Sequence, residues 1–69
     1  MEYYVTYRVP ADADAPTRNS LGYLNHSDEP DTLDTICETC QQFTCEAELF
    51  DAAGFRRGWV HANGTYTLQ

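Results

Sequence analysis

Hydrophobic and polar residues alternate over two stretches of this chain, and that period of two predicts β-strands. In residues 2–9, one face carries four side chains suited to a buried surface: Tyr3, Val5, Tyr7 and Val9. Residues 43–50 alternate in the same way, and their hydrophobic positions are Phe43, Cys45, Ala47 and Leu49. Each stretch therefore predicts a strand that turns one face toward a hydrophobic core.

Two more strands follow, separated by the strongest turn signal in the sequence. Residues 55–62 and 65–69 flank the dipeptide Asn63-Gly64, which is favoured in two-residue β-hairpin turns. A two-residue turn sets a register in which Trp59 lies opposite Leu68 and one face gathers four large side chains: Phe55, Trp59, Tyr66 and Leu68. We expect a helix to cover this face.

A period of three to four residues predicts one helix over residues 28–42. Its hydrophobic positions are Leu33, Ile36, Cys37 and Cys40, at the spacing of one buried stripe. Ser27 or Asp28 is placed to cap the helix, and Pro30 is acceptable in a first turn whose N–H groups have no helical partner. The stripe is expected to face the sheet.

The segment between the first strand and this helix is less regular. Residues 10–20 are polar and contain two prolines, which predicts a loop, and residues 21–26 predict a short strand. The expected fold is therefore α+β, with an antiparallel sheet of about four to five strands and one helix packed on one face. The elements follow in the order β-(β)-α-β-β-β, and residues 1–69 form a single domain.

The charge of the chain narrows the choice of partners. Eleven acidic residues stand against four arginines and no lysine, so the formal net charge is −7. A surface this negative repels nucleic acid and anionic lipid, and it attracts a basic protein surface. We therefore expect no direct binding to nucleic acid or to a membrane.

Size and residue types favour binding over catalysis. A chain of 69 residues has little stability to spare for a strained active site or a deep pocket. Only two serines are present, and neither lies in a nucleophile motif, so we expect a protein that is not an enzyme and needs no cofactor. No apolar run approaches the roughly 18 residues of a membrane span, and no secretory signal is visible, which predicts a soluble, cytoplasmic protein.

Acidic residues are concentrated in residues 28–51, where eight acids and no base occur. Solvated helices usually mix the two signs, because Glu–Lys pairs four residues apart stabilise a helix and like pairs destabilise it. Closely spaced carboxylates on rigid elements can imitate a phosphate backbone and occupy a groove evolved for DNA. The predicted partner-binding residues are Asp28, Glu29, Asp31, Asp34, Glu38, Glu46, Glu48 and Asp51. A merely solvated face, or adaptation to high salt, is the alternative.

Cysteine and histidine raise a second possibility. Cys37 and Cys40 are separated by two residues, and together with Cys45 and either His26 or His61 they contain the ligand types of a zinc site. The two helical cysteines also belong to the hydrophobic stripe, and free cysteine is among the most buried residue types. We expect the thiols to pack in the core, reduced as in a cytoplasm, with no metal bound.

The chain resembles the small anti-CRISPR inhibitors carried by phages and mobile elements. The resemblance lies in the opening strand EYYVTYRV, the single helix DEPDTLDTICETCQQ, the meander that ends NGTYTLQ and the acid-only stretch 28–51. It implies a monomer or weak homodimer that acts in the cytoplasm of a bacterial host. Such a protein would bind a CRISPR surveillance complex stoichiometrically and block access of target DNA through an acidic, DNA-mimicking surface. A small zinc-binding or acidic structural module is the alternative.

Overall fold

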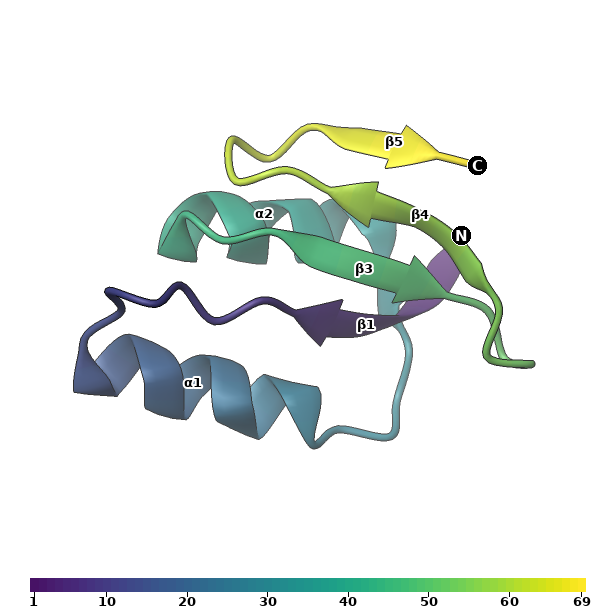
Figure 1. The fold of residues 1–69 in the computed structure, drawn as a ribbon. Coiled ribbons are helices and arrows are strands. Elements are labelled where there is room, and N and C mark those ends of the chain that lie inside the picture. The colour runs from purple at the N-terminus through teal and green to yellow at the C-terminus, as the bar shows by residue number, and fades with distance from the viewer.

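The computed structural model describes residues 1–69 and has an α+β fold, as the sequence predicts (Figure 1). Its strands are β1 (Glu2–Tyr7), β2 (Asp31–Thr32), β3 (Ala47–Phe50), β4 (Arg56–Val60) and β5 (Tyr66–Leu68). All neighbouring strands are antiparallel, in the order β2-β1-β3-β4-β5. The predicted meander of the last three strands is confirmed, and the helices are α1 (Ala15–Asn25) and α2 (Leu33–Phe43).

The hydrophobic core lies between one face of the sheet and the two helices. Alternation along β1 and β3 turns Tyr3, Tyr7 and Leu49 inward. Leu21 of α1 and Ile36 of α2 are fully buried against them. In Figure 1, α2 crosses behind the sheet and α1 runs alongside β1, so the opposite face of the sheet is not covered by a helix.

Helix α1 corrects the prediction of a loop over residues 10–20 and a strand over residues 21–26. The Asp14 side chain caps this helix by accepting a hydrogen bond from the Thr17 N–H at 2.9 Å, and Pro16 occupies the first turn. Only Leu21 of the helix is buried. A helix with one buried side chain has almost no hydrophobic periodicity. The only signals of α1 in the sequence were therefore the capping residue Asp14 and Pro16 in the first turn.

Helix α2 begins at Leu33, five residues after the predicted start at residue 28. The preceding residues instead form β2, which pairs Thr32 with Glu2 of β1. Thr32 caps the helix by accepting a hydrogen bond from the Thr35 N–H at 3.3 Å, so Ser27 and Asp28 are not the caps. Pro30 disfavours helical geometry at the residue before it, which explains the later start.

The register of the last hairpin also differs from the prediction by one residue. Trp59 pairs with Thr67 rather than Leu68, because the turn spans residues 62–64 and is closed by a hydrogen bond from the His61 N–H to the Thr65 carbonyl oxygen at 2.7 Å. A one-residue change of register moves side chains to the opposite face. Val60 is therefore the buried residue of this region and Trp59 faces away from the helices.

The four large side chains expected under a helix therefore do not share a helix-covered face. Trp59 is on the uncovered face, and the other three are exposed: Phe55, Tyr66 and Leu68. The predicted strand over residues 43–50 is also shorter, since Phe43 ends α2 and β3 begins at Ala47.

Candidate functional site

The eight carboxylates of the predicted partner-binding surface do not form one continuous surface. Five follow one another along the loop after α1, through β2 and onto α2: Asp28, Glu29, Asp31, Asp34 and Glu38. We call these five residues the acidic strip. Glu46 and Glu48 alternate with the buried Ala47 and so project from the uncovered face of the sheet, while Asp51 begins the turn between β3 and β4. The sheet separates the two groups.

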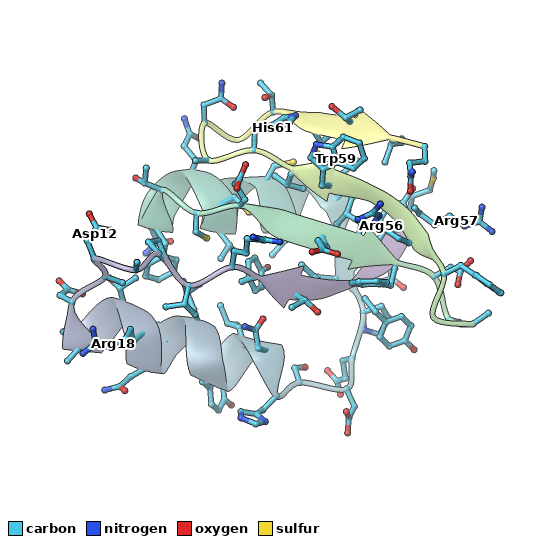
Figure 2. The ribbon with its side chains drawn as sticks, in the orientation of Figure 1. Asp12, Arg18, Arg56, Arg57, Trp59 and His61 are labelled. Atoms are coloured by element: carbon cyan, nitrogen blue, oxygen red, sulfur yellow. The ribbon has the colours of Figure 1, made fainter.

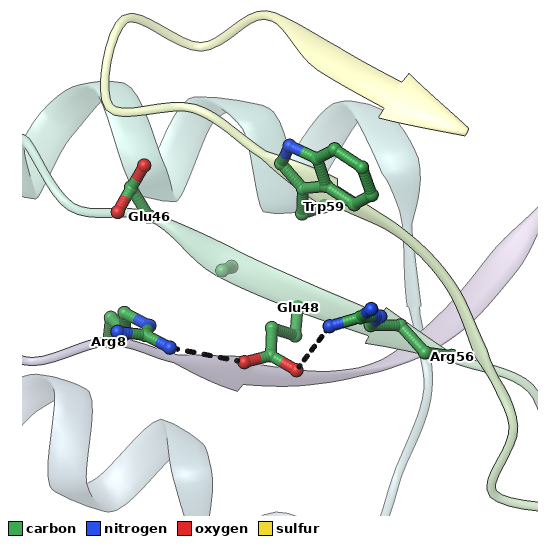
Figure 3. A pocket seen from close by; sticks show the side chains of 6 residues that line it. Arg8, Glu46, Glu48, Arg56 and Trp59 are labelled. Atoms are coloured by element: carbon green, nitrogen blue, oxygen red, sulfur yellow. Dashed lines mark ion pairs between the residues drawn. The ribbon is translucent and has the colours of Figure 1, made fainter. Parts of the chain in front are cut away.

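Glu48 is neutralised by two arginines from neighbouring strands. Its carboxylate oxygens lie 3.5 Å from Arg8 Nη2 and 3.8 Å from Arg56 Nη1 (Figure 3). Both arginines lie outside residues 28–51 in sequence, but strand pairing brings them beside Glu48. The sequence predicts Glu48 as a partner-binding residue, and in the structure its charge is already paired within the chain.

Asp51 has a structural role in the turn. One carboxylate oxygen accepts hydrogen bonds from the N–H groups of Ala53 and Phe55, both at 3.0 Å, and the other accepts from Arg57 Nε at 2.9 Å. The bond from Phe55 and the neighbouring Arg57 hold the pKa of Asp51 below its usual range. This carboxylate is fully engaged within the chain.

The acidic strip has no such compensation. The three ion pairs of the structure use Glu48 and Asp51 as their acids, so no residue of the strip is paired. The fourth arginine, Arg18, donates to the carbonyl oxygen of Ala13, and Figure 2 shows it at the N-terminal end of α1. Asp31 is half-buried, and the other four carboxylates of the strip are exposed.

The strip is held by elements that are anchored in the core. Ile36 and Cys40 of α2 are fully buried, which fixes the helix that carries Asp34 and Glu38. Asp31 pairs with Tyr3 in the sheet. Three of the five unpaired charges therefore lie on a strand or helix and the other two on the preceding loop. Such a set of like charges suits long-range attraction of a basic surface.

The uncovered face of the sheet contains a second feature, which the sequence prediction missed. A pocket of about 180 Å³ is lined by Arg8, Glu46, Ala47, Glu48, Arg56 and Trp59 (Figure 3). The guanidinium carbon of Arg56 lies 5.9 Å from the centre of the Trp59 ring, within the range of a cation–π contact. The charges of two arginines and two glutamates balance here, so the pocket attracts neither anions nor cations.

The cysteines and histidines are not arranged as a metal site. Cys40 and Cys45 are buried in the core, where burial raises the pKa of Cys40 to about 12 and also raises that of Cys45. The ring of His61 is hydrogen-bonded to Thr67 at 3.0 Å, and His26 follows α1 on the surface. No group of three or more His, Cys, Asp or Glu side chains is placed to hold a metal ion.

Neither helix has the length and apolar composition needed to cross a membrane. No protein-family model matches the chain, and no curated protein or solved structure is significantly similar to it.

Proposed function

We propose that this protein is an inhibitor of the anti-CRISPR type, which binds a CRISPR surveillance complex stoichiometrically and blocks target DNA. In this proposal the acidic strip occupies a basic groove that otherwise receives the DNA backbone. The proposal uses five of the eight partner-binding residues expected from the sequence. Glu48 and Asp51 are left out because they are paired within the chain, and Glu46 because it lies on the other side of the sheet.

The observation that carries the proposal is the separation of charge. Three of the four arginines are paired with Glu48 or Asp51, and none is paired with the strip. Eleven acids less the two that are paired leaves nine, and the strip contains five of these nine. A protein that used acids only for solubility would gain from pairing some of them along α2, since opposite charges four residues apart stabilise a helix.

The carboxylate spacing on α2 supports mimicry of a phosphate backbone. Asp34 and Glu38 are separated by four residues of one helix, so they project from the same side about 5–6 Å apart. DNA presents one charge per roughly 1.7 Å of helix axis over both strands. The strip can therefore replace several phosphates, although its charges are less dense. The CRISPR complex as the partner rests on the resemblance described above.

The proposal is tested by competition for DNA. Purified surveillance complexes of several CRISPR types are mixed with labelled target DNA and increasing amounts of the protein, and DNA binding is followed by fluorescence anisotropy. We expect one complex to lose its DNA at about one equivalent of the protein. If every complex keeps its DNA, the proposed partner class is wrong.

Two double variants test the role of the acidic strip in the same assay. Asp34→Lys with Glu38→Lys reverses two charges of the strip, and we expect it to abolish inhibition. Asp12→Lys with Glu46→Lys changes the net charge equally but alters residues outside the strip, so it should inhibit nearly as well as the unmodified protein. Equal inhibition by the two double variants would overturn the assignment of the strip.

A further inference from the structure

Strand β5 is an open edge of the sheet. Its one neighbour is β4. Backbone hydrogen bonds join His61 to Thr65 at 2.7 Å and Gln69 to Arg57 at 2.9 Å, so residues 65, 67 and 69 direct their backbone groups toward β4. The N–H and C=O groups of Tyr66 and Leu68 consequently point outward, where no strand of this chain pairs with them.

The opposite edge of the sheet is protected against pairing with another chain. Strand β2 has two residues, follows Pro30 and begins with Asp31. A short edge strand, a proline and a charged side chain each discourage an added strand. Residues 62–69, by contrast, contain no charged side chain and no proline. The chain thus protects one edge of its sheet and leaves the other available.

The open edge lies beside the acidic strip. The hairpin packs on α2 at Gly64, where an added Cβ would lie 3.3 Å from Gln41 Cβ and 3.5 Å from the Cys37 carbonyl oxygen. Asp34 and Glu38 precede Cys37 and Gln41 by three residues each, so all four project from the same side of the helix. The side of α2 that faces the hairpin therefore carries two unpaired carboxylates of the strip.

The helix-facing side of β5 is incompletely covered. Tyr66 and Leu68 lie opposite the inward-facing Val60 and Gly58, yet their side chains are 50% and 41% exposed. Figure 1 shows α2 behind β3 and β4, with β5 as the outer strand of the sheet. The result is an apolar surface of two side chains, with unpaired backbone groups along one border and carboxylates of α2 on the other side.

We propose that β5 receives an extended segment of the partner protein, in which arginine or lysine alternates with β-branched residues. The segment adds a strand to the sheet by pairing with the backbone of Tyr66 and Leu68. Its basic side chains lie over the two exposed apolar side chains and reach toward Asp34 and Glu38. This inference rests on the proposed function, because that function requires a basic partner.

Charge selects this occupant over a second copy of the chain. Two copies paired through β5 would bring together two molecules of net charge −7, each with its carboxylates beside the joined edges. An extended basic segment meets the same edge with the opposite sign of charge, and pairing with the backbone adds affinity that the charges alone do not provide.

A capped peptide in which arginine alternates with valine serves as the probe. We expect the amide resonances of Tyr66 and Leu68 in the full chain to shift and to gain protection against hydrogen exchange when the peptide is added. The same peptide, N-methylated at every backbone nitrogen, keeps its charge but has no N–H group on either edge with which to pair with β5. Loss of its hydrogen bonds should weaken binding by about tenfold or more. Equal affinity of the two peptides would overturn the proposal.

Two variants of the chain separate edge pairing from charge. Leu68→Pro removes an outward N–H that β4 does not use, and Leu68→Val keeps it. We expect both variants to keep the fold. Leu68→Pro should bind the two peptides with equal affinity, whereas Leu68→Val should still bind the unmethylated peptide more tightly. Sedimentation of the unmodified protein should show a monomer; a dimer that Leu68→Pro dissociates would overturn the proposal in favour of a second copy. The DNA competition assay contains no peptide, so it tests the proposed function independently of strand addition at β5.

Discussion

Thr44 shows how a single residue carries backbone strain in this fold. It follows α2 with a φ angle of 51°, and it is the one residue other than glycine with a positive φ. Left-handed geometry is unfavourable for a β-branched residue, and the position after a helix usually holds glycine. The turn from α2 toward β3 imposes this geometry, since the Cys45 N–H bonds to the Cys40 carbonyl oxygen at 3.0 Å.

Replacement of this threonine should stabilise the protein. Thr44→Gly removes the strain and should raise the free energy of unfolding by about 1 kcal/mol, measured by urea denaturation. Gln42→Gly, inside α2, is the matched control and should lower the same quantity by roughly 0.5–1 kcal/mol. A fall in stability for both variants would show that Thr44 is not strained.

The buried thiol and phenol make stability depend on alkaline pH. Burial raises the pKa of Cys40 from 9.0 to about 12, and burial likewise raises that of Tyr7 from 10.0 to about 12. A raised folded-state pKa of this kind gives stability that is complete below the unfolded-state value and is lost as pH rises toward the folded-state value. The free energy of unfolding should therefore fall progressively between pH 9 and pH 12.

Denaturation in urea at a series of pH values checks this expectation. Cys40→Val keeps an apolar side chain in the core and removes the thiol. In this variant only Tyr7, and no longer Cys40, contributes to the pH dependence. Its free energy of unfolding should therefore fall less steeply just above pH 9 than that of the unmodified protein. Identical pH dependence of the two proteins would contradict the role of Cys40.

At the scale of elements, α1 is attached to the sheet by the buried Leu21 and by the side chain of Asn25. Strand β1 pairs with β2 only at Glu2 and Tyr3, which leaves one edge of Tyr7 without a strand. The Asn25 side chain takes that place: its Oδ1 accepts from the Tyr7 N–H at 2.7 Å, and its Nδ2 donates to the Tyr7 carbonyl oxygen at 2.9 Å. The last residue of α1 thus completes the hydrogen bonding of a central strand.

Loss of this side chain should destabilise the fold. Asn25→Ala leaves two partly buried backbone groups without their partner and should lower the free energy of unfolding by about 1–3 kcal/mol. Asn19→Ala, on an exposed position of the same helix, should change it by less than about 0.5 kcal/mol. Thermal or urea denaturation compares the two, and equal effects would contradict the docking role of Asn25.

The sequence predicted those elements whose periodicity reflects burial. The first strand and the stripe of α2 place their hydrophobic residues on one side, and both are present in the structure. The meander is present too, although its large side chains do not share one face. Helix α1 was missed because it buries one side chain and is held by hydrogen bonds to Tyr7, which leave no periodic pattern. The register of β5 was missed because turn length is decided by geometry around Gly64, whose φ is 88°.

Gly58 was the signal in the sequence that could have corrected the register. It faces inward on β4, where a Cβ would overlap the carbonyl oxygen of Thr67. A glycine inside a strand often marks a place where another backbone comes close. Assigning Gly58 and Val60 to the buried face would have placed Trp59 on the uncovered face, beside Arg56 and Glu48.

At the scale of the whole molecule, charge is distributed unevenly over the fold. The sequence contains the acidic stretch, but it could not show that arginines from distant segments pair with part of it. Arg8 and Arg56 reach Glu48 only because β1 and β4 both pair with β3. Six acids of the stretch have no ion-pair partner, and five of them lie in one continuous segment, residues 28–38; the sixth, Glu46, lies on the uncovered face of the sheet.

The salt dependence of partner binding tests the acidic strip most directly. Asp34→Asn with Glu38→Gln and the control Asp12→Asn with Glu46→Gln both remove two of the eleven acids. For the unmodified protein and the control, affinity for the surveillance complex should fall steeply as salt rises, because salt screens exposed charges. The strip variant should bind more weakly at low salt and lose affinity less steeply. The same steep dependence in all three proteins would contradict the assignment of the strip as the binding surface.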